Sequence, residues 1–286
     1  MAPLVSFIVA ARNAEQTIDS ALRSLRWQTV PDWEAIVVDD GSSDRTAARA
    51  RAIRDARVHV LKLEAQRGRS FARNAAIDLA VGRYVAIQDA DDVSHPRRLE
   101  LLLDLIRAAP GCGVASGQHA EFERDGEYRT RTRWPTADDD IRGGLLRGRM
   151  TVCHPAALID AELLRRLGGY DEACVRAQDL NLFMRAANTT GFAASDRIVL
   201  YYRHPRVVPF RYWLENHRYR DIAVRRARSS VPAARVSRSC DDPRPGWRCR
   251  ALLSYALYGA RGRLAGSARI AGPAPGADAP INPWNG

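Results

Sequence analysis

The chain has 286 residues, 46% of them hydrophobic and 27% charged, which is typical of a globular protein and excludes a fully disordered chain. The net charge of +11 is uneven: residues 1–205 carry 29 Lys and Arg against 28 Asp and Glu, a net of +1, whereas residues 206–286 carry 15 Arg against 5 acidic residues, a net of +10. The near-neutral first 205 residues argue against a nucleic-acid-binding protein.

Cysteine usage and the N-terminal segment bear on the compartment. The five cysteines are widely spaced and form no CxxC pair, so we expect a reduced protein without structural disulfides or a zinc site. MAPLVSFIVAARNAE has no basic residue ahead of its short apolar run, which favours a first strand over a signal peptide. No stretch approaches the roughly 18 apolar residues of a spanning helix. We therefore expect a cytoplasmic protein.

Residues 1–110 alternate between strand and helix patterns. Apolar runs that are typical of buried strands occur at 4–10, 34–40, 58–63 and 84–89. Helical spacing of apolar residues occurs at 14–28, 70–82 and 96–109. A further helix is expected after the strand at 34–40, with Ser43 or Asp44 as its cap. Short connections between such elements indicate βαβ units, and hence an α/β fold with a mainly parallel sheet flanked by helices.

The pattern changes beyond residue 110. A strand is expected at 113–123, and residues 124–140 are polar and turn-rich, which predicts a hairpin or a mobile loop. Residues 153–172 predict a strand, a helix that starts near Asp160, and a Gly-Gly stop. A helix over 177–191 and a strand over 198–204 follow.

Acidic residues gather where two predicted strands end. Asp39 and Asp40 close one strand, and Asp89, Asp91 and Asp92 close another. In parallel sheets ligands bind beyond the carboxyl ends of the strands, so both acidic clusters should face one crevice. Three carboxylates within four positions repel one another unless a positive group lies among them. Helix capping is the alternative explanation for these acids.

Four segments together resemble the inverting family 2 glycosyltransferases, which have the GT-A fold. They occur in the order and spacing that the family shows, over about residues 3–205, and they read VSFIVAARNAEQTIDSALRSL, VVDDGSSDRT, RGRSFARNAAIDLAVGRYVAIQDADD and LGGYDEACVRAQDLNLFMRA. The resemblance implies transfer of a sugar from a nucleoside-diphosphate sugar, with UDP favoured over GDP and dTDP, to a glycan or a lipid-linked acceptor.

The resemblance also implies a divalent cation, Mg²⁺ or Mn²⁺, as the positive partner of the acids, because hard carboxylate oxygens bind such ions. Asp91 and Asp89 are the implied metal ligands, and Asp89 also lies near the ribose. The late His204 resembles a histidine that ligates the metal in some GT-A enzymes. The other residues implied at the donor site are Ala10, Arg12, Glu15, Asp39 or Asp40, and Arg73.

Inverting transfer needs a base that takes the proton of the acceptor hydroxyl. Asp179 matches the acid of the family's Glu-Asp pair, although the pair is Gln178-Asp179 in this chain. His154 lies in the stretch where relatives line the acceptor pocket. Trp134 and Tyr170 could stack on a sugar ring, with a core position as the alternative. The loop after the first strand departs from the family, which has Pro and an aromatic residue there.

These observations predict a catalytic domain at 1–205, with a nucleotide-binding half at 1–110 and an acceptor half at 111–205. A basic helical extension at 206–271 and a disordered tail at 272–286 follow. The extension mixes aromatic residues and arginines, which suits peripheral contact with anionic lipid or a helical cap packed on the catalytic domain. Two alternatives for the function are a non-catalytic partner subunit that binds nucleotide sugars or glycans, and a nucleotidyltransferase. ARNAEQT lacks the Gly-rich phosphate loop expected of the latter.

Overall fold

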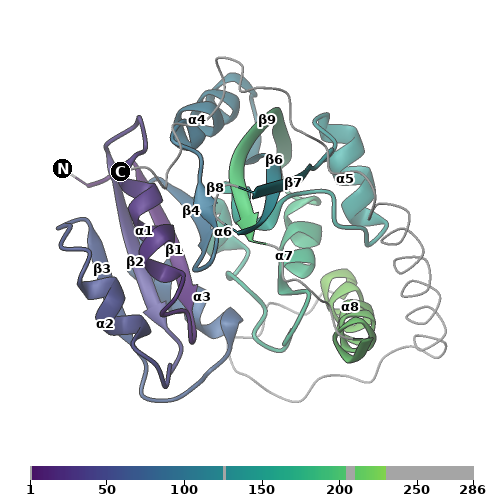
Figure 1. Ribbon diagram of the computed structural model, residues 1–286. Coiled ribbons are helices and arrows are strands. Elements are labelled where there is room, and N and C mark those ends of the chain that lie inside the picture. Colours follow the sequence, from purple (N-terminus) through teal and green to yellow (C-terminus); the bar gives the residue numbers. More distant parts are fainter. Residues whose placement is uncertain (1, 125–126, 204–209, 230–286) are drawn as a thin grey trace.

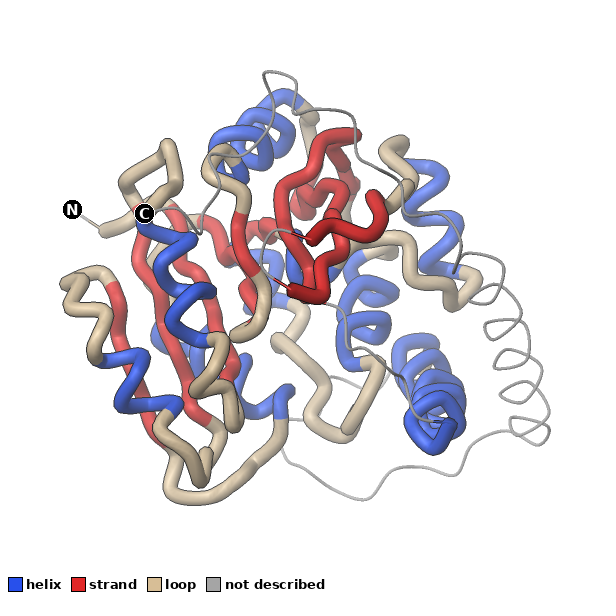
Figure 2. The backbone as a smooth tube through the Cα atoms, viewed as in Figure 1, coloured by secondary structure: helices blue, strands red, loops and turns tan. Residues whose placement is uncertain are grey.

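The computed structural model describes residues 2–124, 127–203 and 210–229. Its central sheet has the strand order β3-β2-β1-β4-β8-β6-β9-β5, and β7 pairs with β6 (Figures 1 and 2). The strands are β1 (Val5–Ala11), β2 (Trp33–Asp39), β3 (Val58–Lys62), β4 (Tyr84–Asp89), β5 (Val93–Ser94), β6 (Cys112–Arg124), β7 (Glu127–Arg131), β8 (Leu158–Asp160) and β9 (Gly191–Arg203). Strands β3, β2, β1 and β4 are parallel to one another, and β6 is parallel to β9. The predicted α/β class is therefore confirmed, while β5, β7 and β8 pair antiparallel.

Helices cover both faces of the sheet (Figure 1). The described helices are α1 (Ile18–Arg26), α2 (Thr46–Arg51), α3 (Arg69–Leu79), α4 (Arg98–Ala108), α5 (Asp138–Leu146), α6 (Ala161–Arg166), α7 (Gln178–Ala186) and α8 (Phe210–Arg228), with a short 3₁₀ turn η1 (His154–Ala156). Alternate residues of β1 point to opposite faces, as the two-residue period of a strand requires. Phe7 packs with α1 and α4, whereas Ile8 packs with α3 and α7. The parallel part of the sheet therefore lies between two apolar layers.

The hairpin expected over residues 124–140 is confirmed by β7, which pairs antiparallel with β6. Helix α5, which begins at Asp138, was not expected. The apolar pair Ile141 and Leu145 is fully buried, and three aspartates in the first turn complement the helix dipole. Two consecutive glycines within α5 weaken its helical signal in the sequence. Gly144 is needed there, because a Cβ atom would lie 2.2 Å from the Thr151 side chain.

The last two predicted elements are also shifted. Helix α7 ends at Ala186, and β9 begins at Gly191, seven residues before the expected strand. The extension of β9 pairs with β6 from Cys112 onward. The start of α6, by contrast, is confirmed, because the Asp160 carboxylate accepts a hydrogen bond from the Leu163 N–H at 2.9 Å.

Candidate functional site

The two predicted acidic clusters lie on the same edge of the sheet. Strand β1 runs between β2 and β4, and its C-terminal residues define the register. Ala11 is level with Asp39 of β2, and Ala10 is level with Asp89 of β4. Three strands therefore bring both clusters and the loop after β1 to the same edge of the sheet.

The Asp89 carboxylate pairs with a buried arginine of α3. Arg73 Nη2 lies 2.8 Å from Asp89 Oδ1, and the arginine side chain is only 4% exposed. Burial opposes the charge of Asp89, but the Arg73 guanidinium outweighs it and holds the pKa of Asp89 below its usual value. Arg73 Nη1 is buried and has no hydrogen-bond partner among the described residues. An arginine donor therefore remains available beside a charged carboxylate.

Asp91 and Asp92 follow in a more repulsive environment. Asp91 is at the surface of the site, yet the surrounding protein and then the charge of Asp89 raise its pKa to about 6. Asp92 is fully buried, and burial together with Asp91 and Asp89 raises its pKa. Its Oδ1 accepts a hydrogen bond from the Arg203 N–H at 2.9 Å, while Oδ2 has no partner in the described residues. The charges of Arg203, Arg69 and Arg98 act on these acids but do not outweigh burial and the repulsion between the carboxylates.

The residues at this edge fit a divalent cation. Asp89 and Asp91 offer hard carboxylate oxygens, and a nearby cation would relieve the repulsion that raises the pKa of Asp91. Among the described residues no three His, Cys, Asp or Glu side chains form a complete cage. Mg²⁺-type sites in transferases commonly use one or two carboxylates and complete their coordination with substrate phosphates and water. His204 lies outside the described residues.

A buried arginine beneath the acids was missed by the sequence analysis. Arg98, at the start of α4, is fully buried, and it donates to Gln88 Oε1 and Ser94 Oγ, both at 3.0 Å. Its Nη2 donates to the Ile87 carbonyl at 2.6 Å. Burial lowers the pKa of Arg98 to about 10. The sequence did contain a signal for Arg98, because it lies one helical turn before the buried Leu102 and so on the apolar face of α4. A charged side chain on such a face needs hydrogen-bond partners.

The two acids at the end of β2, Asp39 and Asp40, differ in how many of their carboxylate oxygens accept hydrogen bonds. The Asp40 carboxylate accepts hydrogen bonds from the N–H groups of Arg67 and Gly68, at 2.6 and 2.9 Å, and so fixes the loop before α3. Asp39 is fully buried; its Oδ1 accepts from Ser42 N–H at 3.0 Å, and its Oδ2 has no partner among the described residues. Gly41 has a φ of +65°, and a Cβ atom there would lie 2.6 Å from the backbone of Ala65. Of these two acids, Asp39 is therefore the one whose carboxylate keeps an oxygen without a hydrogen-bond partner in the described residues.

The loop after β1 lies against the same turn. Asn13 exchanges hydrogen bonds with the turn, since its N–H donates to Ser42 Oγ and its Oδ1 accepts from Ser43 N–H. Arg12 is exposed at the edge. Glu15 Oε2 accepts from the Arg45 N–H at 3.2 Å and Nε at 3.3 Å. Glu15 therefore contacts the start of α2.

Asp179 lies in the first turn of α7. Its Oδ1 accepts a hydrogen bond from the Leu180 N–H at 2.8 Å, and its side chain is half-buried. The preceding cap residue, Ala177, has φ 54° and ψ 27°, a left-handed conformation that is unfavourable for a residue with a Cβ atom. The charge of Asp179 acts on Arg73 and His154, as does the charge of Asp89. The predicted base and the predicted metal ligand therefore share two neighbours.

His154 and Tyr170 form the buried wall between these acids. His154 Nε2 lies 2.8 Å from the Tyr170 hydroxyl, and both residues are buried. Burial and the Arg73 charge lower the pKa of His154 to about 4, so the ring is neutral at pH 7. Burial raises the pKa of Tyr170, so its hydroxyl stays protonated, and the tautomer of His154 decides which of the two groups donates. Tyr170 has the core position that was the alternative to sugar stacking, and the half-buried Trp134 donates to His119 at 3.4 Å.

The sheet and its flanking helices have the GT-A fold. A solved structure of the mannosyltransferase PcManGT from Pyrobaculum calidifontis, in complex with GDP-Man and Mn²⁺, has a similar fold with a TM-score of 0.62 and 21% identity over 94% of this chain and 77% of that one. The predicted GT-A fold is therefore confirmed.

Sequence comparison identifies the family. The family model for glycosyl transferase family 2 matches residues 6–168, more than half of the chain, and the chain therefore belongs to that family. It is 29% identical over 217 residues to an uncharacterized glycosyltransferase of Methanocaldococcus jannaschii, with 71% of each chain covered. It is also 38% identical over 103 residues to the Escherichia coli UDP-Glc:alpha-D-GlcNAc-diphosphoundecaprenol beta-1,3-glucosyltransferase WfgD, covering 36% of this chain and 41% of WfgD.

Proposed function

We propose that this chain transfers a sugar from a nucleoside-diphosphate sugar with inversion, and that the reaction depends on Mg²⁺ or Mn²⁺. The observation that carries the proposal is the convergence of Asp89 and Asp179 on Arg73 and His154, with Asp91 beside them. Asp89 and Asp91 would hold the cation. When bound, the cation supplies charge neutralisation for the departing diphosphate.

The chain's own residues perform the remaining steps. Asp39, with its buried free oxygen, accepts a hydrogen bond from the nucleoside. Ala10 and Arg12, at the end of β1, lie along the nucleotide, and Arg73 holds Asp89 in its charged form. Asp40 and Glu15 contribute by fixing the two loops around the donor.

Asp179 acts as the base in this proposal. Its carboxylate takes the proton of the acceptor hydroxyl while that oxygen forms a bond to the anomeric carbon. The bond from the anomeric carbon to the diphosphate oxygen breaks on the opposite face, and the nucleoside diphosphate leaves with the electron pair. A carboxylate that accepts the proton in concert with attack requires no elevated pKa.

The donor is proposed to be a UDP sugar and the acceptor a glycan or a lipid-linked sugar. The name of WfgD gives UDP-Glc and a diphosphoundecaprenol acceptor for that relative. A lipid-linked acceptor would make peripheral contact with the cytoplasmic face of the membrane useful. The first turn of α8 presents Arg211 with its side chain 89% exposed and Phe210 39% exposed. No helix in the described part of the chain has the length and apolar character to cross a bilayer.

The Asp179→Asn variant tests the proposed reaction. Asparagine keeps the Oδ1 atom that accepts from Leu180 but cannot take a proton, so we expect transfer to be abolished while nucleotide-sugar affinity is retained. UDP-glucose, UDP-GlcNAc, GDP-mannose and dTDP-glucose, each with Mn²⁺, would first be compared by thermal shift to identify the donor. Full turnover in Asp179→Asn would rule out its role as the base.

A further inference from the structure

Helix α8 packs against the half of the site that carries Asp179. Ile222 and Ala223 are fully buried, and Figure 1 shows α8 beside α7. Arg220 donates two hydrogen bonds to the Gly148 carbonyl, at 3.2 and 2.7 Å, and so ties α8 to the loop after α5. The described part of the basic extension is thus a packed cap on the catalytic domain.

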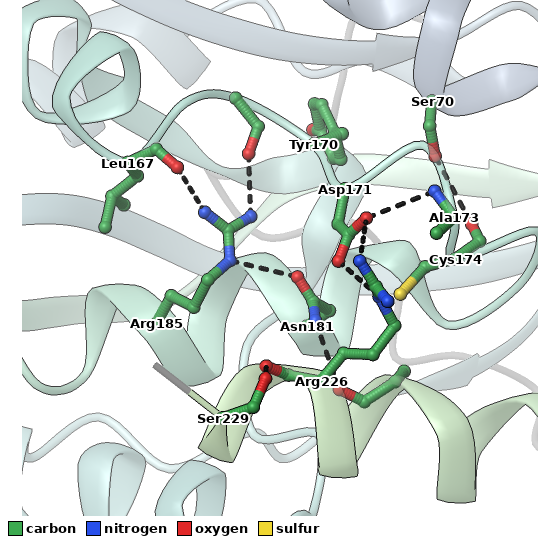
Figure 3. Close-up of polar contacts among 12 residues, drawn as sticks. Ser70, Leu167, Tyr170, Asp171, Ala173, Cys174, Asn181, Arg185, Arg226 and Ser229 are labelled. Carbon is green, nitrogen blue, oxygen red and sulfur yellow. Dashed lines mark hydrogen bonds and ion pairs between the residues drawn. The ribbon is translucent and has the colours of Figure 1, made fainter. Parts of the chain in front are cut away.

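A two-pronged ion pair joins α8 to the loop before α7 (Figure 3). Arg226 Nε lies 2.7 Å from Asp171 Oδ2, and Arg226 Nη2 lies 3.2 Å from Asp171 Oδ1. The side chains are 18% and 4% exposed, so loss of the arginine would remove a close charge partner of a buried carboxylate. Asp171 also accepts from the Ala173 N–H at 3.1 Å, which shapes the turn that leads toward α7.

A second ion pair from α8 lies next to the strained residue that precedes Asp179. Arg176 donates to Glu215 at 2.7 Å and to Asn216 at 3.1 Å, and both acceptors belong to α8. The next residue is Ala177, whose left-handed backbone is unfavourable and persists only where surrounding contacts fix it. These α8 contacts hold one side of that strained turn.

The other side of the turn is held by Asn181, which is fully buried (Figure 3). Its Nδ2 donates to the carbonyl of Ala223 in α8 at 3.1 Å, and its Oδ1 accepts from Arg185 Nε at 3.0 Å. Arg185 in turn donates to the carbonyls of Leu167 and Gly169. In the sequence, Asp179 therefore lies between Arg176 and Asn181, and both of these residues form hydrogen bonds with α8.

We propose that α8 is a positioning element of the transferase, and that Arg226 and Glu215 are positioning residues that hold Asp179 at the acceptor. This inference rests on the proposed role of Asp179 as the base. Arg226 and Glu215 contact Asp171 and Arg176, in the segment that leads to Asp179, whereas β1, β2 and β4 form the donor edge. Their effect should therefore fall on the chemical step and leave donor binding unchanged.

The test uses the full chain with Arg226→Gln, in the last turn of α8, and Glu215→Gln, in its N-terminal half. Arg166→Gln is the matched control, because Arg166 makes an ion pair of similar length, 3.0 Å to Glu162, with side chains 65% and 79% exposed and remote from α8. Two quantities are measured. The first is hydrogen exchange of residues 171–181. The second is the release of nucleoside diphosphate from the nucleotide sugar that the thermal-shift comparison identifies, with Mn²⁺ present.

We expect faster exchange over residues 171–181 in both variants, with unchanged exchange in β1 and β2. We also expect kcat to fall by about tenfold or more with the donor KM within about twofold, since displacement of a catalytic group by about 1 Å can lower rates roughly 100-fold. In the double variant Asp171→Asn/Arg226→Gln the loss should equal that of the more harmful single variant, because the two residues act as one unit.

Two outcomes would overturn the proposal: exchange over 171–181 equal to the control, or faster exchange with kcat equal to the control. The first shows that α8 does not hold the turn, and the second that the turn does not set catalysis. Retained turnover in Asp179→Asn instead removes the base assignment and leaves the exchange result valid. If Arg226→Gln fails to fold, Arg226→Lys keeps the charge but lacks the forked geometry, and the same two measurements apply.

Discussion

Two acids of the site, Asp89 and Asp91, are separated by a single residue, but their pKa values are shifted in opposite directions. Asp89 has a charged neighbour, Arg73, that lowers its pKa, whereas the pKa of Asp91 is raised to about 6. In such a pair, the charge of one carboxylate is already stabilised by an arginine, and the charged form of the other would be stabilised by a bound cation. The sequence motif alone predicts both acids, but the difference between them depends on an arginine 16 positions earlier.

Asp91→Ala tests the metal site at this scale. Removing the carboxylate whose pKa is raised should reduce metal-dependent nucleotide binding by at least tenfold, or about 1.4 kcal/mol, as measured by calorimetry of UDP with and without Mn²⁺. Asp104→Ala, which removes an exposed acid of α4, is the control. Identical UDP affinities in Asp91→Ala and in the unmodified chain, with and without Mn²⁺, would contradict the assignment.

His154 predicts a pH dependence of stability. Its pKa is lowered from 6.5 to about 4 by burial and Arg73, so the unfolded chain binds the proton more readily between these values. Stability is therefore fully present above pH 6.5 and falls as the pH drops toward 4, by up to about 3 kcal/mol. Asp91 and Asp92, with raised pKa values, act in the opposite direction.

The contribution of His154 is isolated by comparing the chain with His154→Gln, which leaves both acids in place. Urea unfolding at pH 7, 6 and 5 should show a steeper loss of the free energy of unfolding in the unmodified chain. Parallel pH profiles in the two proteins would show that His154 does not titrate in this window.

At the scale of elements, the sequence predicts the parallel strands well because their signal is local. The apolar runs of β1, β2 and β4 are bounded by acids or turn residues, and their ends were located to within a residue. Helix α5 was missed because Gly143 and Gly144 weaken its pattern, and Gly144 is needed for close packing against Thr151. The contacts of α8 with Asp171 and Arg176 join residues 39 to 55 positions apart, and no local pattern encodes them.

The cap of α6 gives a prediction for a single element. Asp160 accepts from Leu163 N–H at 2.9 Å, so Asp160→Ala should lower the free energy of unfolding by about 1 kcal/mol. Glu162→Ala, which removes an exposed partner of Arg166 in the same helix, should cost about 0.3 to 0.5 kcal/mol. Urea denaturation of both variants measures the difference, and equal losses would mean that the cap is not the stabilising contact.

At the scale of the whole molecule, the two predicted halves share one sheet. Strand β8 from the acceptor half pairs with β4 of the nucleotide half and with β6 on its other side. The Arg98 side chain also donates to the Ala157 carbonyl across this junction, at 3.4 Å. Sequence reasoning placed the boundary near residue 110 because the βαβ pattern ends there, while the strand pairing across it joins residues 72 to 76 positions apart.

An isolated fragment of residues 1–110 should therefore not fold stably, since β4 would lose its β8 partner and the apolar residues beneath it would be exposed. Limited proteolysis and circular dichroism of this fragment, beside a fragment of residues 1–229, would check the expectation. A cooperative thermal transition in the shorter fragment would show that the nucleotide half is independent.

The placement of β8 also has a consequence for synthesis on the ribosome. The edge of β4 remains unpaired until residues 158–160 have emerged, and β6 waits longer still for β9, whose last described residue is Arg203. A nascent chain of this protein therefore carries an open, apolar strand edge through much of its translation, and it should depend on chaperone protection until the late strands close it.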